Sequence, residues 1–134
     1  MRHDVGVSST TLTDREIGRR VAFDMNVWTT EIRRGIVEMC VLSVLQEQEG
    51  YGYEILERLR NEAELELTES TIYPLLARLS KDGLLLIRIA KSPNGPQRRY
   101  YRMTSEGQRR LTQMIEHWES LNKSVSKLLK GRSK

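Results

Sequence analysis

The sequence has little of the residues that define several classes of protein. Among its 134 residues there is one cysteine, Cys40, which excludes a disulfide framework and a zinc site built from several cysteines. No apolar run approaches the roughly 18 residues of a membrane-spanning helix. The polar start MRHDVGVSST has no hydrophobic stretch typical of a signal peptide. We therefore expect a cytoplasmic protein.

Residue patterns that support catalysis are also missing. The sequence has two histidines, His3 and His117, and it has no Ser-His-Asp set, phosphate-binding glycine loop or H-E-x-x-H motif. His3 lies in the polar start, and His117 lies one position off an apolar row. We expect neither an enzyme nor a bound cofactor or metal ion.

Basic residues are concentrated toward the C-terminal end of the chain. The net charge of +4 is modest, but residues 91–134 hold 11 basic and 3 acidic side chains, against 11 and 15 in residues 1–90. A basic segment suits contact with a polyanion, although solvated surfaces show the same excess. The length corresponds to one compact domain.

The spacing of apolar residues predicts one short helix and four longer ones. Thr13 and Glu16 have the spacing of a capping box, which predicts the short helix over about 14–24. Residues 1–12 are polar and rich in serine and threonine, and we expect them to be mobile. The longer helices are predicted over about 30–48, 53–65, 68–82 and from Ser105 onward.

The second and third longer helices have clear buried faces and precede a β-hairpin. The buried residues are predicted to be Ile55, Leu56 and Leu59 in one helix, and Ile72, Leu75, Leu76 and Leu79 in the other. Gly83 suits the left-handed end of a helix. Strands are predicted at 84–90 and 98–103, and the sequence SPNGP between them is typical of a turn.

The last helix has an apolar row that needs a covering partner. Ser105 and Gln108 have capping-box spacing and predict its start. Its apolar residues follow the alternating spacing of a coiled-coil seam: Leu111, Met114, Trp118, Leu121, Val125 and Leu128. The helix over 30–48 is apolar around most of its circumference, Ile36 and Cys40 included. We expect a homodimer, with packing inside one chain as the alternative.

This order of elements predicts a mainly α fold with a small β-hairpin, a winged helix-turn-helix with a long C-terminal dimerisation helix. In helix-turn-helix proteins the recognition helix enters the DNA major groove, and in the winged form the hairpin lies against the flanking backbone. Short polar and basic side chains suit contact with bases and phosphates. The candidates are Ser70, Thr71, Arg78 and Lys81 on the third longer helix and Lys91, Arg98 and Arg99 at the hairpin.

Five segments of the sequence resemble the PadR family of transcriptional regulators. They are EIRRG at 31–35, YGYEI at 51–55, STIYPLLARL at 70–79, DGL at 82–84 and RYYRMTSEG at 99–107. The single long last helix is similar to that of the small subclass. The resemblance implies an N-terminal extension (1–25), a DNA-binding domain (26–104), a dimerisation helix (105–130) and a basic tail (131–134).

The resemblance also implies a homodimeric repressor that binds a pseudo-palindromic operator in double-stranded DNA. Thr71, Tyr73 and Tyr53 would contact DNA together with the hairpin arginines, although Tyr73 and the following proline also suit a role in shaping the helix. Some small members stack planar aromatic ligands on a tryptophan at the place of Trp118, which is otherwise a core residue. Trp28 is a further candidate for the same ligand cleft.

Two other functions stay open at this stage. A winged helix also serves as a protein-interaction module. The helix over 53–65 would tolerate this, because its outer face is acidic, with Glu54, Glu57, Glu62 and Glu64. A small-molecule-binding dimer without direct regulation of DNA is the other alternative. Failure to bind any DNA fragment would favour the first, and ligand binding without any effect on DNA affinity would favour the second.

Overall fold

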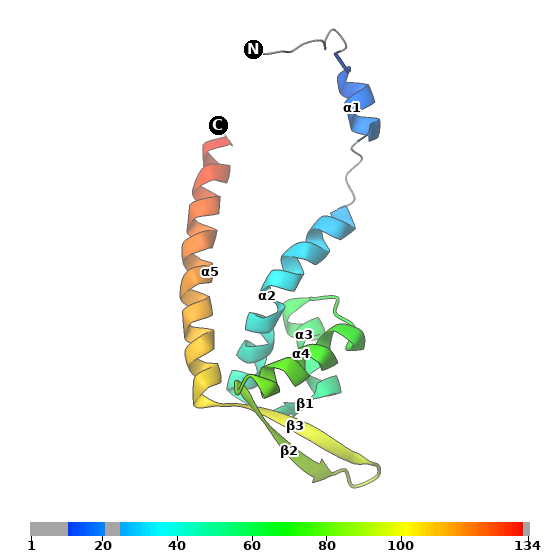
Figure 1. Cartoon of the computed structure of the whole chain (residues 1–134), viewed down its shortest axis with the longest axis vertical. Helices are drawn as coiled ribbons and strands as arrows, with labels where there is room; N and C mark the ends of the chain where they lie inside the picture. Colours follow the sequence, from blue (N-terminus) through cyan, green and yellow to red (C-terminus); the bar gives the residue numbers. More distant parts are fainter. Residues whose placement is uncertain (1–10, 21–24, 133–134) are drawn as a thin grey trace, which may run out of the picture. The chain divides into compact units, whose positions relative to one another are not determined.

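The computed structural model describes residues 11–20 and 25–132 (Figure 1). In chain order the elements are α1 (Asp14–Arg20), α2 (Met25–Glu47), β1 (Gly50–Tyr51), α3 (Gly52–Ala63), α4 (Glu69–Lys81), β2 (Leu85–Lys91), β3 (Gln97–Met103) and α5 (Ser105–Arg132). None of the helices within the described ranges is long and apolar enough to cross a membrane. Most of the start that we predict to be mobile, and the last two residues of the basic tail, lie outside the described residues.

The chain divides into two compact units, Met1–Ile32 and Arg33–Lys134. In the first unit, the predicted capping box opens α1. The Glu16 N–H donates to Thr13 Oγ1 over 3.2 Å, and the Thr13 N–H donates to Glu16 Oε2 over 3.2 Å. Both bonds satisfy amide donors that a helix start leaves unpaired. The capping box is therefore confirmed, while residues 21–24 of the predicted helix lie outside the described residues.

The second unit has its core between α2, α3 and α4. The predicted buried faces of α3 and α4 are confirmed, because all seven of their residues are at most 8% exposed. Val41 and Leu42 of α2 and Leu111 of α5 complete the centre of this core, each with no exposed surface. Each such aliphatic side chain contributes about 1.5–3 kcal/mol when it is buried. The core thus holds α4 in place by one face.

Two helices differ from their predicted ends. α2 begins at Met25, five residues before the predicted start. Polar and apolar residues are mixed before Thr30, so the spacing there does not predict a helix, although no residue in this segment breaks one. α3 ends at Ala63 because Glu64 adopts a left-handed conformation with φ of 54°. The Arg60 guanidinium then donates to the Leu67 carbonyl over 3.0 and 3.2 Å, which fixes the connection to α4.

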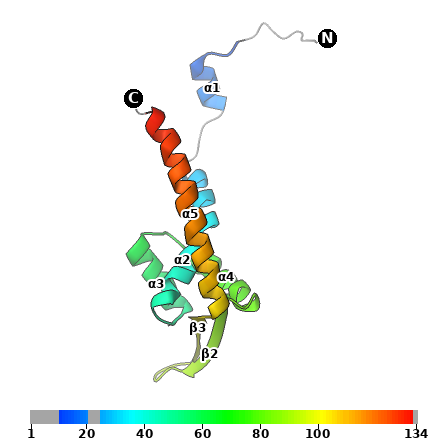
Figure 2. The ribbon, with the colours of Figure 1, turned by 90° about the vertical axis from the view of Figure 1, so that its left-hand side faces the viewer.

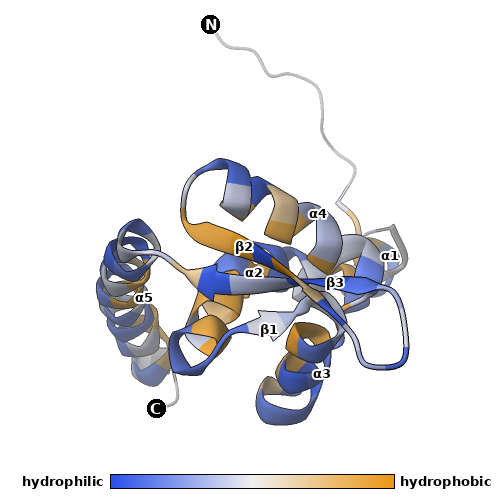
Figure 3. Ribbon diagram, turned by 90° about the horizontal axis from the view of Figure 1, so that it is seen from below, coloured by the Kyte–Doolittle hydropathy of each residue, from blue (hydrophilic) through white to orange (hydrophobic). Residues whose placement is uncertain are grey.

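The sheet has three antiparallel strands in the order β1-β3-β2, one more than the predicted hairpin. The sequence pattern misses β1 because a two-residue strand has no readable alternation. Gly83, with φ of 81°, confirms the predicted left-handed turn before β2. Figure 3 shows that α4 lies beside β2 and α3 beside β1, so the sheet joins the two helices at one side of the core.

The last helix, α5, begins at Ser105 but is capped by the residue before it. Thr104 Oγ1 accepts from the Gly107 N–H over 3.0 Å and donates to the Gly83 carbonyl over 2.7 Å. The predicted capping box of Ser105 and Gln108 is therefore wrong, because the sheet places the Thr104 hydroxyl over the first turn. Figure 2 shows α5 rising from the end of β3.

Candidate functional site

The face of α4 opposite the core is a row of small and basic side chains. Ser70, Pro74, Ala77 and Lys81 are exposed and recur at spacings of four, three and four residues, so they share one side of the helix. We predicted Ser70 and Lys81 as DNA-contacting residues and missed Pro74 and Ala77. The helical spacing that predicts the buried face also places Pro74 and Ala77 on the opposite, exposed side, so the sequence carries the signal for them. Because three of these four side chains are small, another molecule could approach the backbone of α4 closely on this side.

Three hydroxyl groups gather at the first turn of α4. Thr68 Oγ1 lies 2.8 Å from Ser70 Oγ and 3.4 Å from Thr71 Oγ1. The Ser70 and Thr71 side chains are exposed. Hydroxyl groups both donate and accept hydrogen bonds, so they suit base edges as well as phosphate oxygens. The predicted residues Ser70 and Thr71 are therefore accessible and lie next to each other.

Tyr73 joins α4 to the start of α3. Its ring lies so close to Gly52 that a Cβ at that position would overlap it. Burial is the main cause that raises the pKa of the Tyr73 hydroxyl, and the nearby Glu69, Tyr101 and Tyr51 raise it further, so this hydroxyl stays protonated at neutral pH. Tyr73 thus has a structural role, and the residue is still 41% exposed.

Arg78 and Tyr53 were further predicted contacts. Tyr53 is exposed on the first turn of α3. The Arg78 guanidinium pairs with two carboxylates, Glu38 at 3.1 Å and Asp82 at 3.9 Å. Glu38 also accepts from Arg110 of α5 over 2.9 Å. Among the residues of α4 predicted to contact DNA, Arg78 is therefore the one whose charged group forms ion pairs with other described residues.

The predicted basic residues of the hairpin lie on both faces of the sheet. Lys91 pairs with Gln97 in the register, and side chains alternate along β3, so Lys91 and Arg99 share a face while Arg98 points to the other. The Arg98 guanidinium carbon lies 4.3 Å from the centre of the Tyr51 ring. The predicted residues are all exposed, but they do not form a single row.

A stack of aromatic and basic side chains covers the Arg98 face. Tyr51 and Tyr100 meet edge to face with ring centres 5.5 Å apart, and the Arg88 guanidinium lies 4.8 Å from the Tyr100 ring. Arg88 also pairs with Glu49, and the hydrogen bond from Arg88 holds the pKa of the Glu49 carboxyl below its ordinary value. Sequence reasoning missed Arg88, although strand alternation places it on this face.

The apolar row of α5 divides into a buried and an exposed part. Leu111 has no exposed surface, and Met114 packs partly against the same core. Trp118, Leu121, Val125 and Leu128 are 39% to 73% exposed in the single chain. On α2, the two other predicted dimer residues, Ile36 and Cys40, are half-buried. Much of the predicted seam therefore presents apolar surface to its surroundings.

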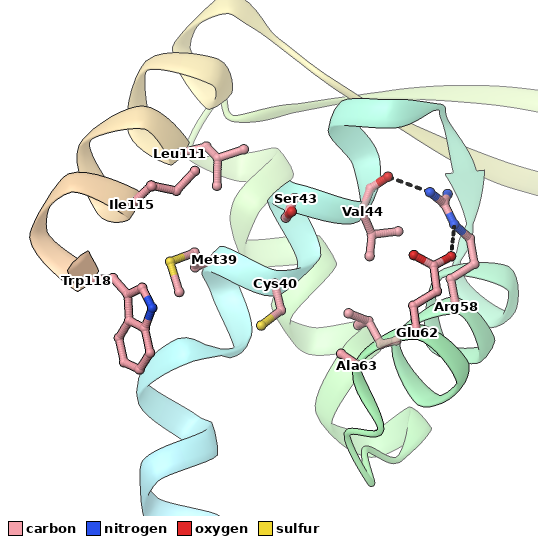
Figure 4. A pocket seen from close by; sticks show the side chains of 11 residues that line it. Met39, Cys40, Ser43, Val44, Arg58, Glu62, Ala63, Leu111, Ile115 and Trp118 are labelled. Carbon is pink, nitrogen blue, oxygen red and sulfur yellow. Dashed lines mark hydrogen bonds and ion pairs between the residues drawn. The ribbon is translucent and has the colours of Figure 1, made fainter. Parts of the chain in front are cut away.

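A cavity of about 350 Å³ lies between α2, α3 and α5 (Figure 4). Met39 and Cys40 line it from α2, and Ile115 and Trp118 line it from α5. Burial raises the pKa of the Cys40 thiol, which is therefore neutral at physiological pH. At the far end, Arg58 donates to the Val44 carbonyl over 2.7 Å.

The other predicted ligand residue, Trp28, belongs to the first unit, where its side chain is exposed. The side chains in the described ranges form no group of three or more histidine, cysteine, aspartate and glutamate residues that would hold a metal ion.

Comparison with known proteins identifies relatives over most of the chain. The family described as "Transcriptional regulator PadR-like family" matches residues 41–113. A PadR family transcriptional regulator from Eggerthella lenta is 36% identical, with a TM-score of 0.72 over 78% of this chain and 91% of that one. A PadR-like transcriptional regulator from Bacillus cereus is 32% identical, with a TM-score of 0.67 over 74% of this chain and 96% of that one.

A more distant structure contains nucleic acid. Bacillus subtilis PadR in complex with operator DNA is 23% identical, with a TM-score of 0.57 over 60% of this chain and 45% of that one. At this identity the similarity is one of fold.

Proposed function

Because the chain belongs to the PadR-like family of transcriptional regulators, we propose that it represses transcription by binding operator DNA through α4. The observation that carries this proposal is the exposed row of α4, Ser70, Pro74, Ala77 and Lys81, directly opposite the buried face. A helix held by one face, with small side chains on the other, fits the major groove closely. The Bacillus subtilis protein, which has the same fold, forms a complex with operator DNA, and this supports binding of such DNA here.

Base contacts are assigned to the start of α4. The exposed hydroxyls of Ser70 and Thr71 would contact base edges, and the exposed Lys81 and Tyr53 would contact phosphates. The Tyr73 hydroxyl would add a donor that is neutral at physiological pH, and burial moves its pKa further from that range. Arg78 stays outside this set because its guanidinium bonds to Glu38.

Phosphate contacts are assigned to Lys91, Arg98 and Arg99 of the hairpin. These side chains are exposed, and no carboxylate within the described residues lies within ion-pair distance of them. Because a phosphate contact releases counterions, each one makes the affinity fall more steeply with salt. The hairpin would thus supply affinity for any sequence, and α4 would supply discrimination.

The active form would be a homodimer. The exposed residues of α5, namely Trp118, Leu121, Val125 and Leu128, need covering, and the half-buried Ile36, Cys40 and Met114 extend the apolar surface. Residues 26–104 would then form the DNA-binding domain and residues 105–130 the dimerisation helix. Two copies of α4 related by a two-fold axis would bind a pseudo-palindrome with half-sites about 34–36 Å apart.

A small planar aromatic effector would release the protein from DNA. The cavity beside Trp118 is largely apolar, and its volume of about 350 Å³ suits a small ring system. Trp118 offers a flat face on which such a ring would stack. Trp28 is a further candidate for contact with the ligand. By linkage, the effector must bind the free dimer more tightly than the DNA-bound dimer.

The decisive experiment is selection of bound fragments from random and genomic DNA with the purified protein. We expect enrichment of a pseudo-palindromic sequence, and a Thr71→Ala variant that loses preference at particular base pairs of that sequence. No enrichment at low salt would contradict DNA binding and favour a protein-interaction module. Enrichment that planar aromatic compounds leave unchanged, although they quench Trp118 fluorescence, would contradict release by the effector.

A further inference from the structure

One carboxylate near the recognition helix bonds to two arginines from different elements. Glu38 of α2 accepts from Arg78 Nη2 over 3.1 Å through Oε1 and from Arg110 Nη1 over 2.9 Å through Oε2. Its side chain is only 14% exposed. A partly buried carboxylate is costly unless charged donors compensate it, so both bonds are favoured by the fold.

Arg78 lies on the part of α4 that the proposed function turns toward DNA. It follows Pro74 by four residues and Ala77 by one, so it flanks the exposed row. Its side chain is 53% exposed, and its second nitrogen lies 3.9 Å from Asp82. An arginine at such a place is an obvious phosphate ligand, yet here its guanidinium is directed to two protein carboxylates.

We propose that Glu38 limits the affinity of this protein for DNA of any sequence by holding Arg78 away from the phosphates. This inference rests on the proposed function, because it requires α4 to face DNA. Phosphate contacts carry no sequence information, so the bridge lowers affinity without touching the base contacts of Ser70 and Thr71. Glu38 acts through Arg78 and is therefore a positioning residue.

The test measures binding of a mixed-sequence 30-base-pair duplex across a range of salt concentrations. The Glu38→Leu variant removes both acceptor oxygens and fits a largely buried position. Freed Arg78 should bind one further phosphate, which raises the affinity at low salt about three- to tenfold and steepens the slope of log K against log salt by about 0.9. Arg78→Gln in the Glu38→Leu background should restore the wild-type slope.

The matched control is Glu57→Leu. Glu57 pairs with Arg60 over 3.0 Å on α3, so this variant makes the same change of charge without freeing an arginine of α4. Its salt slope should equal that of the wild type. Arg110→Gln in the Glu38→Leu background should leave the steeper slope unchanged, because Arg110 lies on α5 and not on the recognition helix.

The single Arg78→Gln variant keeps the proposal testable even if Glu38→Leu does not fold. If Arg78 makes no phosphate contact in the wild type, this variant keeps the wild-type slope, whereas a slope flatter by about 0.9 would overturn the proposal. A Glu38→Leu protein that folds and binds with an unchanged or flatter slope would also overturn it, and would indicate a purely structural role. If the wild type binds no duplex at low salt, the proposed function itself fails.

Discussion

Gly52 and Tyr73 meet at the corner where α3 begins, and their contact defines how α4 sits against its neighbour. The Tyr73 ring occupies the space that a Cβ at Gly52 would need. Gly52 therefore serves close packing, because its φ does not require a glycine. Tyr73 fills this space while the residue as a whole stays 41% exposed. A single residue thus combines a structural contact with a proposed functional one.

We predict that Gly52→Ala destabilises the protein, because the added methyl group would overlap the Tyr73 ring. Overpacking of this kind costs about 1–3 kcal/mol, so thermal denaturation should show a lower midpoint. Gly35→Ala is the matched control, because nothing lies within 4 Å of the new Cβ on α2. The control should be neutral or up to about 1 kcal/mol more stable. Equal stability of both variants would contradict the contact.

The hairpin arginines give a second prediction at the residue scale. Arg98→Ala and Arg99→Ala together should weaken binding to all DNA sequences about equally, because phosphate contacts are independent of sequence. The slope of log K against log salt should flatten by about 0.9 for each arginine that binds a phosphate in the wild type. The control is Arg109→Ala, which removes one charge from the pair with Glu106 on α5. An unchanged slope in the double variant would remove the hairpin from the proposed interface.

Among the elements, α5 is fixed to the end of the sheet by contacts of its first turn. Thr104 bonds to both the first turn of α5 and the Gly83 carbonyl, and Gly107 packs against the Leu84 carbonyl so closely that no Cβ fits there. The start of α5 is therefore joined to the turn that follows α4. Any change in the direction of α5 would alter this junction.

We predict that Thr104→Ala destabilises the protein by about 1–2 kcal/mol, since it removes the cap of α5. Ser105→Ala is the matched control: the sequence spacing suggests a cap at Ser105, but the hydroxyl that caps α5 is that of Thr104. The control should change the free energy of unfolding by less than about 0.5 kcal/mol. Chemical denaturation with urea measures both variants. The reverse order of stability would show that the cap is assigned to the wrong residue.

At the scale of the whole molecule, charged and apolar surfaces have different tasks. The Glu38 bridge joins α2, α4 and α5 inside one chain, while the exposed apolar row of α5 has nothing of its own chain to cover it among the described residues. The net charge of +8 in residues 91–134 is likewise divided between the hairpin and the outer side of α5. Its distribution is therefore more informative than its sum.

We predict that Leu121→Glu combined with Val125→Glu converts the proposed dimer to a monomer, because two charges would enter an apolar interface. Operator affinity should fall on the order of a hundredfold, since a monomer engages one half-site. Sedimentation measures the mass, and anisotropy measures the affinity. Lys123→Glu, off the apolar row of the same helix, is the control that should remain dimeric. A wild type that sediments as a monomer would contradict the dimer.

Features that depend on near neighbours in the chain were predictable from the sequence. The buried faces of α3 and α4 repeat with the helical period. The capping box of α1 joins two residues three positions apart, and Gly83 adopts its left-handed conformation in the turn after α4. The exposure of Ser70, Thr71 and Lys81 follows from the same period, because the side of a helix opposite its buried face is exposed. The local sequence therefore determines these features, and no particular tertiary contact is needed to predict them.

Other features were decided by the tertiary structure, because they join residues far apart in sequence. Glu38 meets Arg78 across 40 positions and Arg110 across 72. β1 exists because β3 provides hydrogen-bonding partners for two residues, and Arg98 lies over Tyr51 because of that pairing. Periodicity reports which face of an element is buried, but not which element covers it. The sequence alone therefore determined the helices and their buried faces, whereas packing decided which arginines remain available to bind DNA.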